Sequence, residues 1–175
     1  PPRTFSSAAS DVYKRQVTFV QRSNPEKFLA ECEGNYKYEP TFIKCDVSHI
    51  EELKIALQTT AKEQGAVTVL VNNAANDTRH TLDEFTSQQW DQTMEVNLKP
   101  HFFAAQEVVE GMKISGGGSI INFSSISYMM GNEGYPAYAT AKSAITGLTR
   151  SLARELGPHS IRVNAIMPGW VLTKR

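Results

Sequence analysis

Short β-branched runs alternate with longer helical segments along this 175-residue chain, and this alternation limits its possible folds more than any other feature. The runs are almost continuously apolar, as strands buried on both faces of a sheet are. They are Val17–Val20, Thr41–Cys45, Val67–Val71, Ser119–Ser124 and Ile161–Met167. Helical patterns lie between them at Pro25–Cys32, Ser48–Gln64, Ser87–Met112 and Tyr138–Leu156. The alternation predicts a single α/β domain built on a doubly wound parallel sheet.

The third helical segment carries two local signals. Thr86, with Gln89 three residues later, predicts a capping box at its start. Pro100 has no backbone N–H to donate, so we expect the helix to be disturbed within one turn of Asn97. A disturbed turn exposes backbone oxygen atoms to which a water molecule can bind.

Composition excludes several classes of function. The formal net charge is zero, which gives no basic footprint for nucleic acid, and no apolar run is long enough to span a membrane. Cys32 and Cys45 have no ligand partners at metal-site spacing, so we expect no metal centre. Reduced thiols are typical of a reducing compartment, which predicts a cytoplasmic protein.

Residues 6–16 read SSAASDVYKRQ, which is the translation of a transposon adapter oligonucleotide used to prepare sequencing libraries. We therefore expect residues 1–16 to be a non-native leader and residues 17–175 to be the natural domain. The alternative is a genuine polar leader. Finding these codons in the source genome would support that alternative.

Candidate site residues follow four of the five predicted strands. In open parallel sheets, ligands bind beyond the carboxyl ends of the strands. The residues at these ends are Asp46–Val47, Asn72–Ala75, Ser124–Ser125 and Pro168–Gly169. Tyr138 and Lys142 lie one helical turn apart, which places the phenol and the ammonium on one helix face. Alone, this pair is better explained by a structural phenol and a solvated lysine, but with the strand ends it indicates a catalytic site.

Together these residues resemble the short-chain dehydrogenase/reductase superfamily, from Val17 to Arg175. The resemblance is carried by Asp46–Val47, Asn72–Ala74, Asn97, Ser125, Tyr138, Lys142 and Pro168–Thr173. It implies a Rossmann-like fold, with two departures. Ala75 replaces the family's glycine, and the first strand with its glycine-rich phosphate-binding turn is missing. In the family that strand lies between Val17–Val20 and Val67–Val71, so we expect two exposed sheet edges and an inactive fragment truncated at both ends.

The resemblance implies four catalytic residues. Tyr138 exchanges a proton with the substrate hydroxyl while a hydride passes between carbon and nicotinamide, and Ser125 holds the reacting oxygen. Lys142, with the positive nicotinamide, is expected to lower the tyrosine pKa from about 10. Asn97 is expected to support a bound water in a proton relay to Lys142, and the alternative is an ordinary polar helix residue.

The same resemblance implies a nicotinamide cofactor, NADP or NAD. The strand Val17–Val20 is followed by Gln21 and Arg22 rather than by an acidic residue. Because arginine pairs with phosphate through two donors, NADP is favoured, with an exposed turn arginine as the alternative. The expected cofactor contacts are Arg22, Asp46, Val47, Asn73, Ala74, Tyr138, Lys142, Val171 and Thr173. Asn72 is expected to tie neighbouring strands together instead.

The segment Asn72–His80 is similar to that of bacterial aldose 1-dehydrogenases, which oxidise sugars to lactones. The candidate contacts to this small-molecule substrate are Asn76, Ser125, Tyr128, Asn132 and Tyr135. Except for Ser125, each has a solvated loop position as the alternative. Two other functions remain open: a ketone or 3-oxoacyl reductase, and a non-catalytic nucleotide-binding protein.

A homo-oligomer, either a tetramer or a dimer, is also implied by the resemblance. Its contacts are expected along the helices at Ser87–Met112 and Tyr138–Leu156. In the second helix, Ala137, Ala141 and Ala144 either permit close approach of a partner or pack on the sheet.

Overall fold

The structure is a computed structural model, and it describes residues 16–33 and 39–171. The expected leader, except Gln16, and the expected cofactor contact Thr173 lie outside the described residues. The strands are β1 (Thr18–Gln21), β2 (Thr41–Lys44), β3 (Val69–Asn72), β4 (Gly118–Phe123) and β5 (Ile161–Ile166). The helices are α2 (Glu26–Cys32), α3 (Ile50–Gln64), α4 (Ser87–Asn97), α5 (Lys99–Ile114), α6 (Ser127–Met130) and α7 (Pro136–Leu156), followed by the 3-10 turn η1 (Gly157–His159). All five predicted strands are therefore present.

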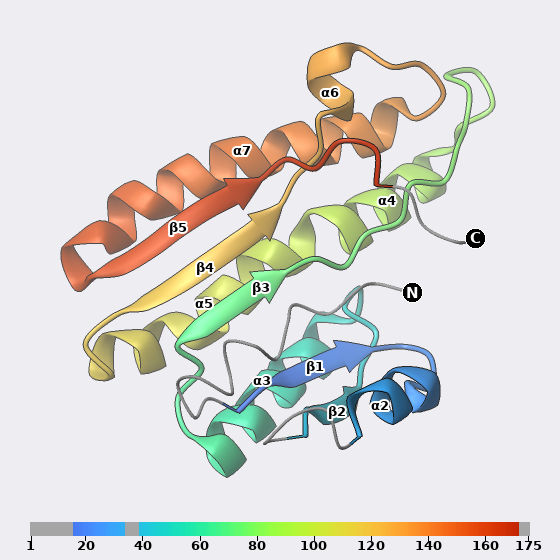
Figure 1. Cartoon of the computed structure of the whole chain (residues 1–175). Coiled ribbons are helices and arrows are strands. Elements are labelled where there is room, and N and C mark those ends of the chain that lie inside the picture. Colours follow the sequence, from blue (N-terminus) through green and yellow to red (C-terminus); the bar gives the residue numbers. More distant parts are fainter. Residues whose placement is uncertain (1–15, 34–38, 172–175) are drawn as a thin grey trace.

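The strands pair in parallel, as predicted, but in the described residues they form two sheets rather than one. β1 pairs with β2, and β4 lies between β3 and β5. The arrowheads of β1, β3, β4 and β5 point the same way, so the carboxyl ends of these strands lie on one side of the molecule (Figure 1). No described strand lies between β1 and β3. These two strands are the edges that the sequence predicted to be exposed.

Helices α4, α5 and α7 lie on the same face of the β3–β4–β5 sheet (Figure 1). The register partners Leu70, Ile120 and Val163 point to this face and are buried. Val69 and Ile166 point to the opposite face and are each 41% exposed. The described helices that contact this sheet all lie on one face of it. The prediction that every strand is buried on both faces is therefore wrong for the described residues.

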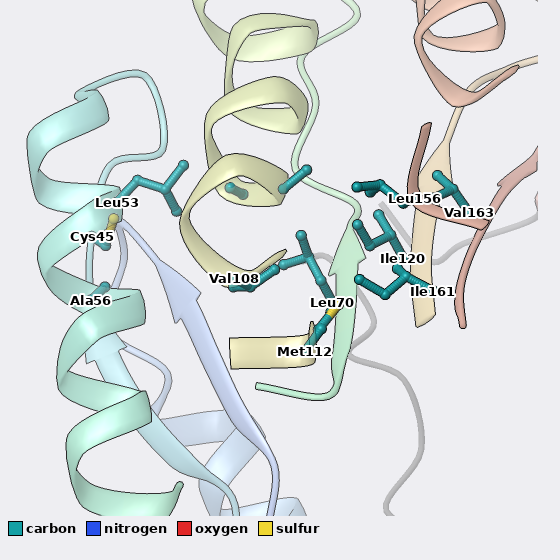
Figure 2. Close-up of a cluster of buried hydrophobic side chains, with 12 residues drawn as sticks. Cys45, Leu53, Ala56, Leu70, Val108, Met112, Ile120, Leu156, Ile161 and Val163 are labelled. Atoms are coloured by element: carbon teal, nitrogen blue, oxygen red, sulfur yellow. The ribbon is translucent and has the colours of Figure 1, made fainter. Parts of the chain in front are cut away.

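The hydrophobic core joins the two sheets. Leu70, Met112 and Ile120 pack between the larger sheet and α5, while Cys45 and Leu53 come from the end of β2 and from α3 (Figure 2). All five belong to one continuous cluster, and α3 packs directly against α5. Apolar burial therefore holds the β1–β2 unit beside the larger sheet although β1 and β3 are not paired.

The segment predicted as a single helix at Ser87–Met112 is two helices. The first, α4, ends at Asn97; Leu98 leaves helical geometry with φ −130° and ψ −54°, and α5 begins at Lys99. Pro100, in the first turn of α5, is the physical reason, because its ring and missing N–H stop the first helix from continuing. The predicted disturbance near Asn97 is confirmed, and it is a complete break.

The predicted capping box at the start of α4 is also confirmed. The Gln89 amide donates to Thr86 Oγ1 at 3.2 Å, and the Thr86 amide donates to Gln89 Oε1 at 2.8 Å.

In the turn before β4, Gly117 has φ 142° and lies so close to Ser160 that a Cβ atom would meet the Ser160 carbonyl oxygen at 2.7 Å. A glycine is therefore required there.

Within residues 16–33 and 39–171, no helix is both long and apolar enough to cross a membrane. The same residues contain no group of three or more His, Cys, Asp or Glu side chains placed to hold a metal ion.

Candidate active site

The catalytic candidates lie at the side of the molecule where the strands end. β4 ends at Phe123, and Ser125 follows two residues later. α7 starts at Pro136, whose fixed φ suits the first turn of a helix, and presents Tyr138 and Lys142 one turn apart. Because α7 packs against β4 and β5, these side chains meet the end of β4. The structure thus brings Ser125, Tyr138 and Lys142 together.

Tyr138 is half-buried beside Ser125. Burial raises the pKa of the Tyr138 phenol, a hydrogen bond with the Ser125 side chain lowers it, and the pKa remains above its ordinary value. The charge of Asp77 raises this pKa and the charge of Arg79 lowers it. The Ser127 amide donates to Ser125 Oγ at 3.1 Å, which fixes the serine side chain. The two hydroxyl groups are therefore placed to hold one oxygen atom of a ligand between them.

Lys142 is 1% exposed, and its Nζ donates a hydrogen bond to the Phe123 carbonyl at 2.7 Å. Nζ lies 5.7 Å from the centre of the Tyr138 ring. Burial lowers the Lys142 pKa from 10.5 to about 8, because the ammonium loses its hydration. The expected lowering of the Tyr138 pKa by Lys142 is not found among the chain's own interactions, since Nζ is bonded to the end of β4 instead of the phenol.

Asn97 is fully buried at the end of α4 and holds the loop that follows β3. Its Oδ1 accepts from the Asn76 amide at 2.9 Å, and its Nδ2 donates to the Asn76 carbonyl at 3.0 Å. Nδ2 also donates to the Thr93 carbonyl at 3.0 Å. The side chain therefore satisfies both backbone groups of Asn76, a structural role that the sequence did not indicate. The water relay at Asn97 stays a prediction.

Asn72 ties the strands together, as predicted. Its Nδ2 donates to Asn122 Oδ1 at 2.9 Å and to the His101 carbonyl at 3.5 Å. Asn122 Nδ2 in turn donates to Thr149 Oγ1 at 3.0 Å. Side-chain amides thus connect β3, β4, α5 and α7 beneath the site.

His101 lies near Lys142, and sequence reasoning missed it. It is 1% exposed, and neither ring nitrogen makes a hydrogen bond of good geometry within the described residues. Burial, reinforced by the charge of Lys142, lowers the His101 pKa from 6.5 to about 3, against the weaker opposing effect of the backbone of Asn72 and Phe123, so the imidazole is neutral near pH 7. A single histidine within an apolar helical pattern does not indicate that the ring is buried near a lysine.

The loop between β3 and α4 is folded onto the start of α7. The His80 amide donates to the Gly134 carbonyl at 2.9 Å, and the Ala137 amide donates to His80 Nε2 at 3.4 Å. The His80 ring also stacks on Phe85, with ring centres 3.6 Å apart. Two segments that are distant in the sequence therefore form one wall of the site.

Tyr135 and Asn132 belong to this wall. Asn132 Nδ2 donates to Tyr135 Oη at 3.1 Å, and the Tyr135 ring packs edge-on against Tyr138 with centres 5.7 Å apart. The Arg79 guanidinium lies 3.9 Å from the centre of the Tyr135 ring. Because Tyr135 is only 3% exposed, its ring supports Tyr138 and Arg79, contrary to the expectation that it faces a ligand.

Tyr128 is held by contacts of its own, and its assignment as a substrate contact stays a prediction. The Tyr128 hydroxyl lies 3.2 Å from Thr146 Oγ1 and donates to Met167 Sδ at 3.4 Å. Thr146 is eight residues beyond Tyr138 on α7, which is about 12 Å along the helix axis. The short helix α6 packs against α7 and holds Tyr128 on that helix.

Arg22 and Asp46 lie together beyond β1 and β2, with Arg22 Nη1 3.6 Å from Asp46 Oδ2. Partial burial acts to raise the Asp46 pKa, but hydrogen bonds from Ser48 and the charges of Arg22 and His49 hold it below its ordinary value. The Arg22 side chain is 74% exposed, so its donors remain open to an anion. The pair is therefore available to a ligand at this end of the molecule.

The remaining expected cofactor contacts are spread along the same side. Val47 packs its side chain against the core, which leaves its backbone for a ligand. Asn73 and Ala74 are partly buried directly after β3, and Val171 is exposed beyond β5. The strand ends thus carry contacts from Arg22 at one end of the molecule to Ser125 and Tyr138 at the other.

A parallel α/β fold with serine, tyrosine and a buried lysine at the strand ends defines the class of nicotinamide-dependent oxidoreductases. A family model described as short chain dehydrogenase matches residues 7–175, and the chain belongs to this family.

Three of the proteins to which this chain is similar carry the names of sugar dehydrogenases. The chain is 43% identical to a protein named "Probable galactose dehydrogenase GalD" from Rhizobium meliloti (strain 1021), covering 98% of this chain and 69% of that protein. It is 48% identical to the D-xylose 1-dehydrogenase of Caulobacter vibrioides, covering 91% of this chain and 63% of that protein. The solved structure of Thermoplasma acidophilum aldohexose dehydrogenase, in ligand-free form, superposes with a TM-score of 0.76 at 30% identity. That match covers 88% of this chain and 56% of the other. The chain thus spans roughly two thirds of the length of the curated relatives it matches.

Proposed function

We propose that the gene product containing this chain is an NAD(P)-dependent dehydrogenase that oxidises the C1 carbon of an aldose to a lactone. The observation that carries the proposal is the placement of the Ser125 hydroxyl close to the Tyr138 phenol, next to the buried Lys142, at the end of β4. The names of the sugar-oxidising relatives support the substrate class.

The chain's residues divide the chemistry between them. Ser125 and Tyr138 hold the C1 oxygen of the sugar, and the Tyr138 phenolate accepts the proton of the C1 hydroxyl. The nicotinamide supplies the hydride acceptor and, in its oxidised form, a positive charge near the phenol. Since the chain's own groups, Lys142 included, leave the Tyr138 pKa raised, the positive charge of the oxidised nicotinamide would be needed to form the phenolate.

The donors of the chain fit both ends of such a cofactor. Arg22 offers an exposed guanidinium beyond β1, suited to a 2′-phosphate, which favours NADP over NAD. Asp46 partly opposes this preference, because its carboxylate already pairs with Arg22 at 3.6 Å. We propose that the backbone of Val47, Asn73 and Ala74 contacts the adenosine half and that Val171 contacts the nicotinamide half. Thr173, the other expected nicotinamide contact, lies outside the described residues. We propose NADP as the preferred cofactor, with NAD as the alternative.

Two further properties belong to the proposal. We propose a homo-oligomer, a tetramer or a dimer, formed along α4, α5 and α7, where Trp90 and Phe102 are 43% and 46% exposed. Ala137 and Ala141 are buried within the chain and do not take part, whereas Ala144 is exposed. A cytoplasmic location is proposed because Cys32 and Cys45 are both free thiols.

The test is a substrate panel with the full-length gene product. Sugar oxidation is measured with aldoses and NADP⁺ or NAD⁺. The rival reductase activity is measured with cyclic ketones and 3-oxoacyl thioesters and NADPH. Tyr138→Phe is expected to reduce kcat at least about 100-fold, because it removes the proton-transfer group. Turnover of ketones alone would overturn the aldose assignment. Unchanged activity of Tyr138→Phe would refute the role of Tyr138 in proton transfer, whereas no turnover of any substrate by the unaltered protein would favour the non-catalytic nucleotide-binding alternative.

A further inference from the structure

Arg79 is placed by the fold rather than left free on the surface. Its guanidinium stacks on the Tyr135 ring at 3.9 Å, and that ring is held edge-on against Tyr138 and by the bond from Asn132. The catalytic phenol, Tyr135 and Arg79 therefore form a continuous stack. A stacked guanidinium keeps the N–H groups at its edge available for hydrogen bonds.

The segment that carries Arg79 is anchored on both sides. Asn76 is held by two hydrogen bonds from the buried Asn97 side chain. His80 is held by its backbone bond to Gly134 and by the Ala137 amide. Only residues 77–79 lie between these anchors. Asp77 and Arg79 are therefore fixed beside the catalytic residues although both are on a loop.

Asp77 and Arg79 also lie near enough to the reacting group for their charges to act on it. The charges of both side chains reach the Tyr138 hydroxyl strongly enough to act on its proton affinity, in opposite directions. Their closest approach, 3.9 Å between Arg79 Nη2 and Asp77 Oδ2, is too long for a hydrogen bond between them. Their side chains are 52% and 49% exposed, so donors and acceptors remain open to a ligand.

The chemistry of the pair selects a class of ligand. A guanidinium offers only donors and a carboxylate only acceptors, and each hydroxyl of a sugar can both donate and accept. The opposite charges balance, so the pair gives no net attraction to a uronate or a sugar phosphate and suits a neutral ligand. An alcohol that lacks neighbouring hydroxyls would leave both charged groups without partners.

We propose that Asp77 and Arg79 are specificity-determining residues that bind adjacent hydroxyl groups of a neutral cyclic sugar whose C1 oxygen is held by Ser125 and Tyr138. The inference rests on the proposed function and deepens it. It distinguishes polyhydroxylated sugars from acidic sugars and from simple cyclic alcohols.

The test compares substrates that differ in their hydroxyl groups. In the full-length gene product, kcat/KM is measured with an aldose, its 2-deoxy and 3-deoxy analogues, the corresponding uronic acid, and cyclohexanol. Arg79→Met and Asp77→Asn are expected to lower kcat/KM for the aldose about 10- to 100-fold, the range for losing a hydrogen bond to a charged group. They are expected to change cyclohexanol turnover, and that of at least one deoxy sugar, less than about 3-fold.

Arg154→Met, at the exposed end of α7, is the matched control for loss of one arginine and is expected to leave all substrates unchanged. Equal losses for the aldose and for cyclohexanol would overturn the inference, because they would indicate an effect on Tyr138 alone. Unchanged kcat/KM for every substrate would overturn it as well. If Arg79→Met fails to fold, Arg79→Lys keeps the charge but not the planar stack and is expected to show a smaller loss, still selective for the aldose. The proposed function fails separately, if the unaltered protein oxidises no aldose.

Discussion

Lys142 carries a charge at a deeply buried position. Its replacement by methionine tests whether the buried charge lowers the free energy of unfolding. Methionine has a similar volume and no charge. Lowering the lysine pKa from 10.5 to about 8 corresponds to about 3 kcal/mol of unfavourable free energy in the folded state at pH 7, at about 1.4 kcal/mol for each pKa unit. Losing the bond from Nζ to the Phe123 carbonyl costs about 1.5–3 kcal/mol. We therefore expect Lys142→Met to be as stable as the unaltered protein at pH 7, or up to about 1.5 kcal/mol more stable, while losing activity.

The pH dependence gives the sharper comparison. The pKa of Lys142 is lower in the folded state than in the unfolded state, so the unfolded state binds more protons between about pH 8 and 10.5. The unaltered protein therefore gains stability from this group as the pH rises through that range, by about 2 kcal/mol between pH 7 and 9.5. Lys142→Met lacks this gain, so its advantage at pH 7 is expected to disappear at pH 9.5.

The assay is urea unfolding of both proteins at several pH values, with the full-length gene product free of cofactor. Lys113→Met, a lysine in the last turn of α5, is the matched control for removing one lysine. A difference in unfolding free energy that stays constant from pH 7 to 9.5 would refute the reasoning. So would a loss of more than about 3 kcal/mol at pH 7, because it would mean that the buried ammonium is fully compensated.

Two further predictions concern stability. The pKa of His101 is lower in the folded state than in the unfolded state. The unaltered protein is therefore expected to lose about 2 kcal/mol of unfolding free energy between pH 7 and 5 from this group, and His101→Leu is expected to lack this loss. Equal acid sensitivity of the two proteins in urea unfolding would contradict this prediction. Asn97→Ala leaves both backbone groups of Asn76 without their bonds, and we expect about 2–4 kcal/mol of destabilisation, compared with little change for the exposed Asn164→Ala. Thermal unfolding measures both variants, and a loss below about 1 kcal/mol in Asn97→Ala would show that the loop re-forms its bonds elsewhere.

The five strands and the residues at their ends followed directly from the sequence. Continuous apolar runs and their spacing have few structural solutions, and Ser125, Tyr138 and Lys142 are linked by short distances along the chain or by one helical turn. The break at Leu98 was only partly foreseen, because Pro100 predicts a disturbed turn but not whether the helix resumes after it. The contacts of Tyr128 were not foreseen for a similar reason, because the packing of α6 against α7 is not encoded by any local pattern.

The sequence by itself determined the parallel α/β architecture and the identity of the three clustered catalytic candidates, because periodicity and helical spacing act over a few residues. Only the tertiary structure decided what surrounds them. The pairing of Asn97 with Asn76, the neutral His101 near Lys142, and the stack of Arg79 on Tyr135 join segments between 21 and 56 residues apart. Burial and charge at such contacts depend on how the chain packs, and they set the Lys142 and His101 pKa values that local sequence cannot encode.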